Sequence, residues 1–178
     1  MHNWASGSLG EATMRRMLTT TVLVLAGLVA CVAGAPAAAA MPPERFTVEF
    51  DDQFIDTESC GFPFDVRFVG SIDVTLFFDN DGNLIRVQGV GSDLGTATNP
   101  ANGKTATGVD HWLEVERVES GEFAILGLFL HLNFPGAGIV LIDAGNITFD
   151  AEGNVIHLAG PHQVIDEGDF SALCAALA

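Results

Sequence analysis

Apolar and polar residues alternate along most of the chain after residue 43, and this alternation restricts the fold more than any other feature. Phe46, Val48 and Phe50 alternate with polar residues, and the same period of two recurs in 64–76 and 113–116. Successive side chains of a β-strand point to opposite faces, so this period is typical of antiparallel strands with one buried face. The pattern predicts one helix, over 170–178, with Asp169 placed to cap it.

Short turns that contain glycine separate the alternating runs. Segments 78–89 and 149–160 resemble each other, since each holds a strand end, an acidic turn with a glycine and a second strand. A near-palindromic segment at 96–107 and the turns at 119–122 and 135–136 join further strands. Successive hairpins predict an all-β fold, namely an antiparallel up-and-down barrel of about eight strands with a short C-terminal helix. A two-sheet β-sandwich is the alternative.

The first 40 residues have the pattern of a signal peptide. A basic region at 14–17 precedes an apolar run at 18–33, and 38–40 are small residues of the kind a signal peptidase accepts. The apolar run is short for a membrane span. We therefore predict a true start at Met14, a signal peptide over 1–40, a single β domain over 41–178, and a secreted, extracellular protein.

A second cleavage chemistry competes with this one. Residues 28–31 end in Cys31 and fit a lipobox, in which the cysteine is lipidated and becomes the new N-terminus. The protein would then be anchored by lipid at the cell surface. We expect contact with a membrane only in that case.

Two cysteines, Cys60 and Cys174, follow the signal peptide. Thiols in an oxidising compartment pair most simply with each other, so we predict a disulfide between them. They are too far apart in the sequence to show the ligand spacing of a zinc site.

The composition excludes several classes of protein. A charged fraction of 17% together with 13 Phe is not that of a disordered acidic tail. From Met41 onward the chain has 5 Lys+Arg and 22 Asp+Glu, a formal charge of −17. Nucleic acids and anionic membranes select the opposite sign, so we expect no nucleic-acid partner.

One candidate site lies on the hairpin that turns at Ser120 and Gly121. A two-residue turn there would set Trp112 opposite Phe129 and Asp110 opposite His131. A carboxylate that orients an imidazole is the minimum of a general base, although the same pair is equally a buried hydrogen bond. Trp112, Phe129 and His131 are the residues we expect to bind a ligand.

The other titratable candidates are weaker. Asp143 lies in an apolar run, where burial would raise its pKa. We expect His157 on a solvated face and His162 either exposed or at a rim. The histidines after residue 40 lack the spacing of a local metal motif, and we expect neither a metal nor another cofactor.

Three stretches carry a resemblance to a group of known proteins: 60–64, 99–104 and 168–174. Through them residues 44–178 resemble small exported bacterial all-β proteins of unknown function, a resemblance that implies no activity. The expected architecture is also similar to lipocalin-like and allene-oxide-cyclase-like barrels. The Gly-x-Trp motif of lipocalins is missing, and likeness of fold does not assign function.

Three functions follow from this pattern. The first is a non-catalytic exported barrel that holds a small apolar ligand, or nothing, in its interior. The second is a barrel enzyme of isomerase or cyclase type that uses interior Asp and His groups. The third is a cell-surface lipoprotein or interaction module. We favour a protein that is not an enzyme, and the sequence specifies neither the ligand nor the oligomeric state.

Overall fold

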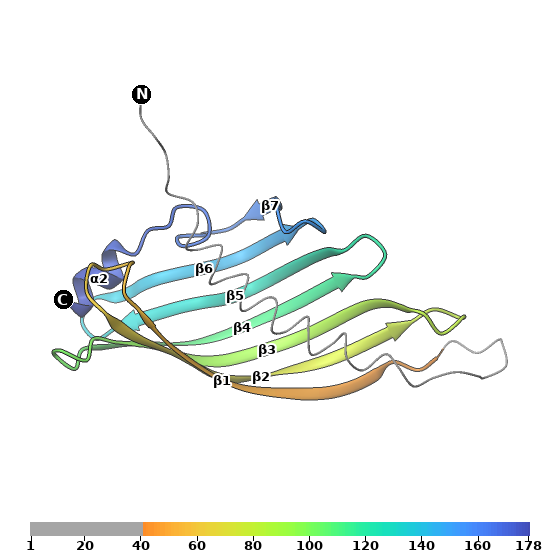
Figure 1. Ribbon diagram of the computed structural model, residues 1–178, viewed down its shortest axis with the longest axis horizontal. Helices are drawn as coiled ribbons and strands as arrows, with labels where there is room; N and C mark the ends of the chain where they lie inside the picture. Colours follow the sequence, from red (N-terminus) through yellow and green to blue (C-terminus); the bar gives the residue numbers. More distant parts are fainter. Residues whose placement is uncertain (1–40) are drawn as a thin grey trace, which may run out of the picture. The chain divides into compact units, whose positions relative to one another are not determined.

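The computed structural model describes residues 41–178, so the predicted signal peptide, the start at Met14 and the lipidation site Cys31 lie outside the described residues. The described chain forms one antiparallel sheet in the order β1-β2-β3-β4-β5-β6-β7, followed by a short helix (Figure 1). The elements are β1 (Glu44–Asp56), β2 (Phe64–Phe78), β3 (Leu84–Thr98), β4 (Thr105–Arg117), β5 (Glu122–Phe134), β6 (Gly138–Phe149), β7 (Val155–Ala159) and α2 (Ser171–Leu177). The predicted all-β, up-and-down fold with a C-terminal helix is confirmed.

The sheet is open, so a barrel is not confirmed. Over residues 41–178 there are seven strands rather than about eight, and neither β1 nor β7 pairs with a second neighbour. The strands differ in length, since β2 and β3 are 15 residues each while β7 ends after 5. The β-sandwich alternative is wrong, since all seven strands belong to a single sheet.

Two acidic turns explain the internal resemblance between 78–89 and 149–160. In the β2–β3 turn, Asp79 Oδ1 accepts hydrogen bonds from the backbone N–H groups of Asp81 and Asn83. Asp150 makes the equivalent bonds in the β6–β7 turn. Gly82 and Gly153 both have φ of 84°, a left-handed conformation that glycine adopts without steric cost. The resemblance therefore reflects one turn used twice.

The main core lies where α2 packs against one end of the sheet. Leu173 and Leu177 of α2 are 1% and 0% exposed. They join side chains of the strands, namely Phe64, Val66, Ala97, Ala106, Leu132, Val140 and Leu141. We call the face of β2, β3 and β4 that carries Phe64, Val66, Ala97 and Ala106 the inner face. Strand alternation and the continuous register of β2, β3 and β4 extend the inner face along each strand away from the helix.

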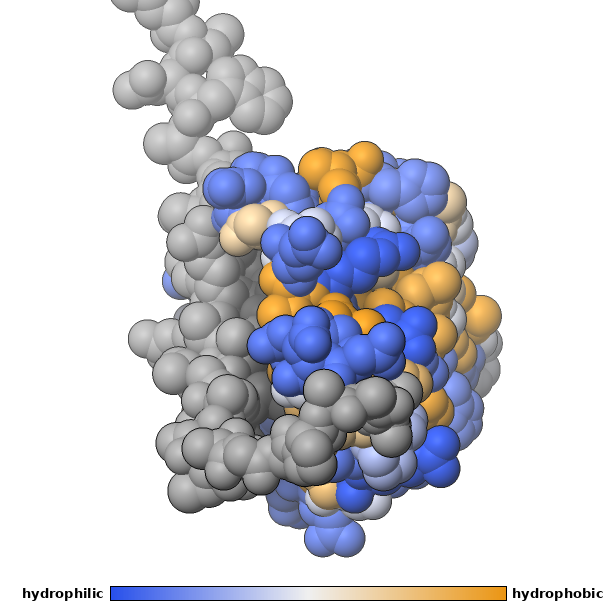
Figure 2. Space-filling model, turned by 90° about the vertical axis from the view of Figure 1, so that its right-hand side faces the viewer, coloured by the Kyte–Doolittle hydropathy of each residue, from blue (hydrophilic) through white to orange (hydrophobic). Residues whose placement is uncertain are grey.

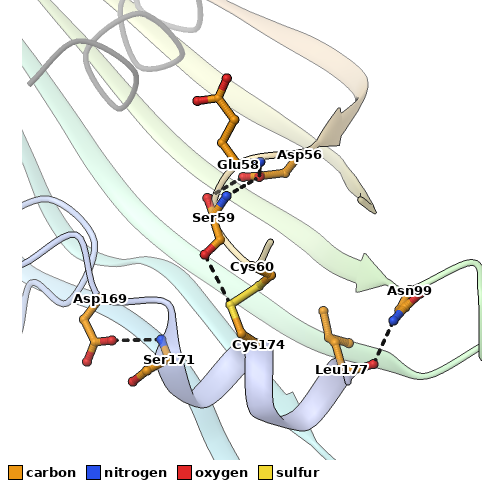
Figure 3. Close-up of a disulfide and its surroundings, with 9 residues drawn as sticks. All are labelled: Asp56, Glu58, Ser59, Cys60, Asn99, Asp169, Ser171, Cys174 and Leu177. Carbon is orange, nitrogen blue, oxygen red and sulfur yellow. Dashed lines mark hydrogen bonds between the residues drawn. A yellow bond between two sulfur atoms is a disulfide. The ribbon is translucent and has the colours of Figure 1, made fainter. Parts of the chain in front are cut away.

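The predicted disulfide between Cys60 and Cys174 is confirmed, with a Cα–Cα distance of 5.1 Å. It joins α2 to the loop after β1 (Figure 3). The residue at the helix N-cap is Phe170, not Asp169 as predicted, but Asp169 Oδ1 still accepts the backbone N–H of Ser171 at 2.8 Å. No helix of residues 41–178 is long and apolar enough to cross a membrane.

The far end of the sheet shows a different surface. Figure 2 views this end and shows apolar side chains between the polar turns. Ile85, Val118 and Val155, which flank the turns, are 47%, 41% and 45% exposed. The helix therefore covers only one end of a long sheet.

Asn99 binds the C-terminal end of α2 through a side-chain hydrogen bond, and its replacement gives a first prediction. Its side-chain Nδ2 donates to the Leu177 carbonyl at 3.0 Å, and the residue is buried (Figure 3). Asn99→Ala should lower the free energy of unfolding by about 1 to 2 kcal/mol, because it removes a buried hydrogen bond to this carbonyl and the one that Asn99 Oδ1 accepts from the Ala101 N–H. Asn102 donates to the same carbonyl but is exposed, so Asn102→Ala should cost less, because water can replace it. Urea denaturation of both variants checks this, and equal losses would contradict it.

Candidate functional site

A row of three inner-face residues crosses the middle of the sheet. The register sets Gly70 opposite Asp93, and Asp93 opposite Asp110, so one carboxyl from β3 faces one from β4. Directly opposed residues of an antiparallel pair have Cβ atoms about 4.5 to 5.5 Å apart. Two acidic side chains are therefore direct neighbours on the inner face.

Neither carboxyl of this pair is satisfied by the surrounding chain. Asp110 is 0% exposed and Asp93 is half-buried. Asp93 Oδ1 and both carboxyl oxygens of Asp110 are buried without a hydrogen-bond partner. Two carboxylates offer only acceptors to each other, whereas a proton held between them makes one a donor. The arrangement therefore favours a pair that shares a proton.

Burial raises the pKa of both carboxyls. The pKa of Asp93 rises to about 7, first through burial and then through the neighbouring Asp110 carboxyl, while His111 opposes the rise. Burial raises the pKa of Asp110 to about 6, against the opposing effects of the His131 backbone and of Asp93. Because the two groups interact, they titrate as a unit and hold about one proton between pH 6 and 7.

Large side chains that lie over glycines enclose the pair. A Cβ at Gly91 would overlap the ring of Trp112, so the indole lies across that position. On the other side of Asp93, a Cβ at Gly95 would lie 3.2 Å from Cε1 of Phe68. The acids thus lie between an indole and a phenyl ring, and this apolar enclosure is the physical cause of their desolvation.

A third acid adjoins Trp112 on the inner face. The indole Nε1 donates to Glu114 Oε1 at 2.8 Å. Burial raises the pKa of Glu114, and the bond from Trp112 partly opposes that rise. The indole is therefore held in place by a carboxylate that is itself largely out of water.

The basic residues of the described chain do not reach these acids. Every lysine and arginine from Met41 onward is exposed: Arg45, Arg67, Arg86, Lys104 and Arg117. Over residues 41–178, lysine and arginine form two ion pairs, Arg67 with Asp51 at 2.7 Å and Arg117 with Glu122 at 3.1 Å. The inner-face acids are left without a cation from the described chain.

The predicted register of the β4–β5 hairpin is wrong by two residues near its turn. The loop spans four residues rather than two, since Arg117 pairs with Glu122, and Trp112 lies opposite Gly127 rather than Phe129. Further from the turn the register shifts by one residue, since three residues of β4, 108–110, lie opposite four residues of β5, 129–132. A Cβ at Gly108 would overlap the His131 carbonyl, so only glycine allows this close approach of the two backbones.

The predicted ligand residues consequently do not face one another as expected. His131 Nε2 lies 2.7 Å from the side-chain amide of Asn133, while its Nδ1 is buried without a partner. Phe129 instead stacks on His162, with ring centroids 5.8 Å apart. Of the three, Trp112 lies over Gly91, the next inner-face residue to Asp93 on β3.

Asp143 belongs to a second buried cluster. It is 1% exposed, its backbone bridges to His162, and Oδ1 accepts the Val164 N–H at 3.1 Å. Burial raises its pKa to about 6, against the backbone N–H groups of Val164 and Ile165 and the nearby His162. These contacts tie the segment after β7 to β6, which is a structural role. The prediction for His162 is wrong, since it is 6% exposed, whereas His157 is exposed as predicted.

Sequence reasoning missed Asp93 and Glu114. The near-palindrome at 96–107 could have predicted that Asp93 faces Asp110. It indicates a hairpin in which Thr98 pairs with Thr105, and the same register continues without a shift to Asp93 and Asp110. Glu114 follows Trp112 by two residues, the spacing that places two side chains on one face of a strand.

The opposite, outer face has two shallow hollows. One of about 370 Å³ lies over Ser71, Ser92 and His111 and also touches Trp112. The other, of about 480 Å³, lies over Glu49, Asp51 and Val69. Residues 41–178 contain no group of three His, Cys, Asp or Glu side chains placed to hold a metal ion.

No family model matches the chain, and no curated protein or solved structure matches it either, so no relative supplies a function for the Asp93–Asp110 pair.

Proposed function

We propose that this is an exported binding protein that holds a small, largely apolar ligand on the inner face of the sheet, beside Asp93 and Asp110. The observation that carries the proposal is an unsatisfied carboxyl pair set in an apolar sheet face. A disulfide fits an oxidising, extracellular compartment, where we place the protein.

Several apolar side chains of the inner face beyond the helix are only half-buried. Phe46, Val48, Leu76 and Ile125 have this intermediate exposure. An exposed apolar face of this kind commonly marks a binding surface. Small-molecule sites combine such a surface with a few polar groups that fix the orientation of the ligand. The acid pair supplies those groups, and a donor on the ligand would satisfy their oxygens.

A second candidate is an isomerase or cyclase that moves protons with the same pair. A general acid or base works best with a pKa near the working pH, and the pKa of Asp93 is about 7. Binding remains the first choice, because it requires only the surface and the unsatisfied oxygens.

Trp112 provides the test of binding. The other tryptophan of the chain, Trp4, lies in the predicted signal peptide, so Trp112 is the sole indole fluorophore from Met41 onward. Titration with N-phenyl-1-naphthylamine, a neutral apolar probe with one N–H donor, should change Trp112 fluorescence saturably. The probe would lie against the indole and accept its excitation energy.

Two truncations locate the bound probe. Ile125 lies on the inner face opposite Glu114, and Ile125→Ala should weaken binding several-fold, since each buried methylene contributes about 0.8 kcal/mol. Val90 is 55% exposed and lines an outer hollow, so Val90→Ala should leave binding unchanged. A titration without saturation, or an effect confined to Val90→Ala, would refute binding at the inner face.

A further inference from the structure

We infer that the ligand of this face is an amphiphilic cation, a protonated primary amine on an apolar body, whose ammonium group lies between Asp93 and Asp110. The inference rests on the proposed binding function and specifies the chemistry of its ligand.

The charges on the inner face require a cation that the described chain does not supply. Asp110 has no exposed surface, and Asp93 and Glu114 are partly or largely buried nearby. The five lysines and arginines from Met41 onward are all exposed, and no ion pair of residues 41–178 involves these three acids. Buried charges are normally paired, so an external cation is the complement this site lacks.

The number of unsatisfied atoms matches an ammonium group. Three carboxyl oxygens of the pair are without a partner, namely Asp93 Oδ1 and both oxygens of Asp110. A primary ammonium carries three N–H donors and no acceptor, whereas an alcohol carries a single donor. The amine is therefore the simplest group that satisfies all three oxygens at once.

The walls of the site suit the same ligand. The Trp112 ring lies over Gly91 on one side of Asp93, and Phe68 lies over Gly95 on the other. Aromatic faces attract cations and also pack against an alkyl body. The net charge of −17 from Met41 onward attracts cations from solution and repels anions. Asp93 is the more exposed acid of the pair and gives access to it.

Binding of an ammonium group displaces the proton that Asp93 and Asp110 share. At pH 6.5 the pair holds about one proton, which passes to the solvent as the ammonium binds, so one positive charge enters and one leaves. Other titratable groups face the pair or lie close to it: Glu114 and His111 from β4 and His131 from β5. Its neighbours on β2, Phe68 and Gly70, do not titrate.

The experiment compares ligands that share an eight-carbon chain, by isothermal titration calorimetry at pH 6.5. Octylamine should bind about tenfold or more tightly than 1-octanol, and octanoate should bind weakest. Octyltrimethylammonium carries the charge without N–H donors and should fall between octylamine and 1-octanol. Repeating the octylamine titration in buffers of different ionisation enthalpy should show about one proton released for each amine bound.

Amide variants test the two acids directly. Asp110→Asn and Asp93→Asn keep the side-chain shape and should each weaken octylamine about tenfold while changing 1-octanol little. Asp81→Asn, in the exposed β2–β3 turn, removes the same charge elsewhere and should leave both affinities unchanged. Thermal melts establish that each variant is folded.

The outcomes separate this inference from the proposed function. Equal affinities for octylamine and 1-octanol, or amide variants without effect on octylamine, would overturn the cationic ligand and leave apolar binding in place. No binding of any of the four ligands, together with no Trp112 response to N-phenyl-1-naphthylamine, would overturn both.

Discussion

Removing the Cys60–Cys174 disulfide is expected to lower the free energy of unfolding by about 4 to 5 kcal/mol. The two cysteines are 114 residues apart, so the bond closes nearly the whole described chain into one loop. Without the bond the unfolded chain gains the conformational freedom of that loop. The folded chain also loses the tether of a seven-residue helix, which is too short to be stable by itself.

Urea denaturation of Cys60→Ser, Cys174→Ser and the double variant measures this loss. All three should be similarly unstable, since each lacks the same bond. Native-state hydrogen exchange should show α2 opening first, with loss of the Asn99–Leu177 hydrogen bond. A loss below about 1 kcal/mol would mean that packing of Leu173 and Leu177 holds the helix without the bond.

Raising the pH from 5 to 8 is expected to destabilise the fold by about 4 kcal/mol. Asp93, Asp110 and Asp143 have folded-state pKa values of about 7, 6 and 6, above the value of about 3.9 for an unfolded Asp. As the pH rises, the unfolded chain releases these protons first. The folded chain therefore holds more protons, and stability falls through this window until the folded carboxyls have also ionised. The magnitude allows for the partial exposure of Asp93.

Variants identify the source of this pH dependence. Asp93→Asn should raise stability at pH 8 and flatten the profile most, because it removes the highest pKa and lets an amide donate to Asp110. Asp143→Asn should flatten it less, and Asp81→Asn in an exposed turn should not change it. Asp79 and Asp150 have pKa values lowered by hydrogen bonds from Asn83 and Asn154, so their contributions are lost only on acidification below this window. Urea midpoints that rise from pH 5 to pH 8 would contradict the prediction.

The sequence by itself determined the local structure. A period of two in residues such as Phe46, Val48 and Phe50 specifies a strand with one apolar face, whatever lies beside it. The acidic turns at Asp79 and Asp150 form within the chain segment itself, through bonds that span two to four residues. The pairing of Cys60 with Cys174 followed because they were the two thiols after the expected signal peptide.

Only the tertiary structure decided which acids meet and which become buried. Alternation assigns a side chain to one face of a strand but does not specify its neighbour on the adjacent strand. That neighbour depends on the length of the turn and on register shifts between the strands. The four-residue loop after Arg117 moved Trp112 away from Phe129, and the His131 imidazole lies against Asn133 rather than against the Asp110 carboxyl. The palindrome at 96–107 could have predicted that Asp93 lies opposite Asp110. The burial of Asp93 could not be predicted in this way. The rings of Trp112 and Phe68 enclose the pair only when three strands lie side by side and glycines leave room for the rings.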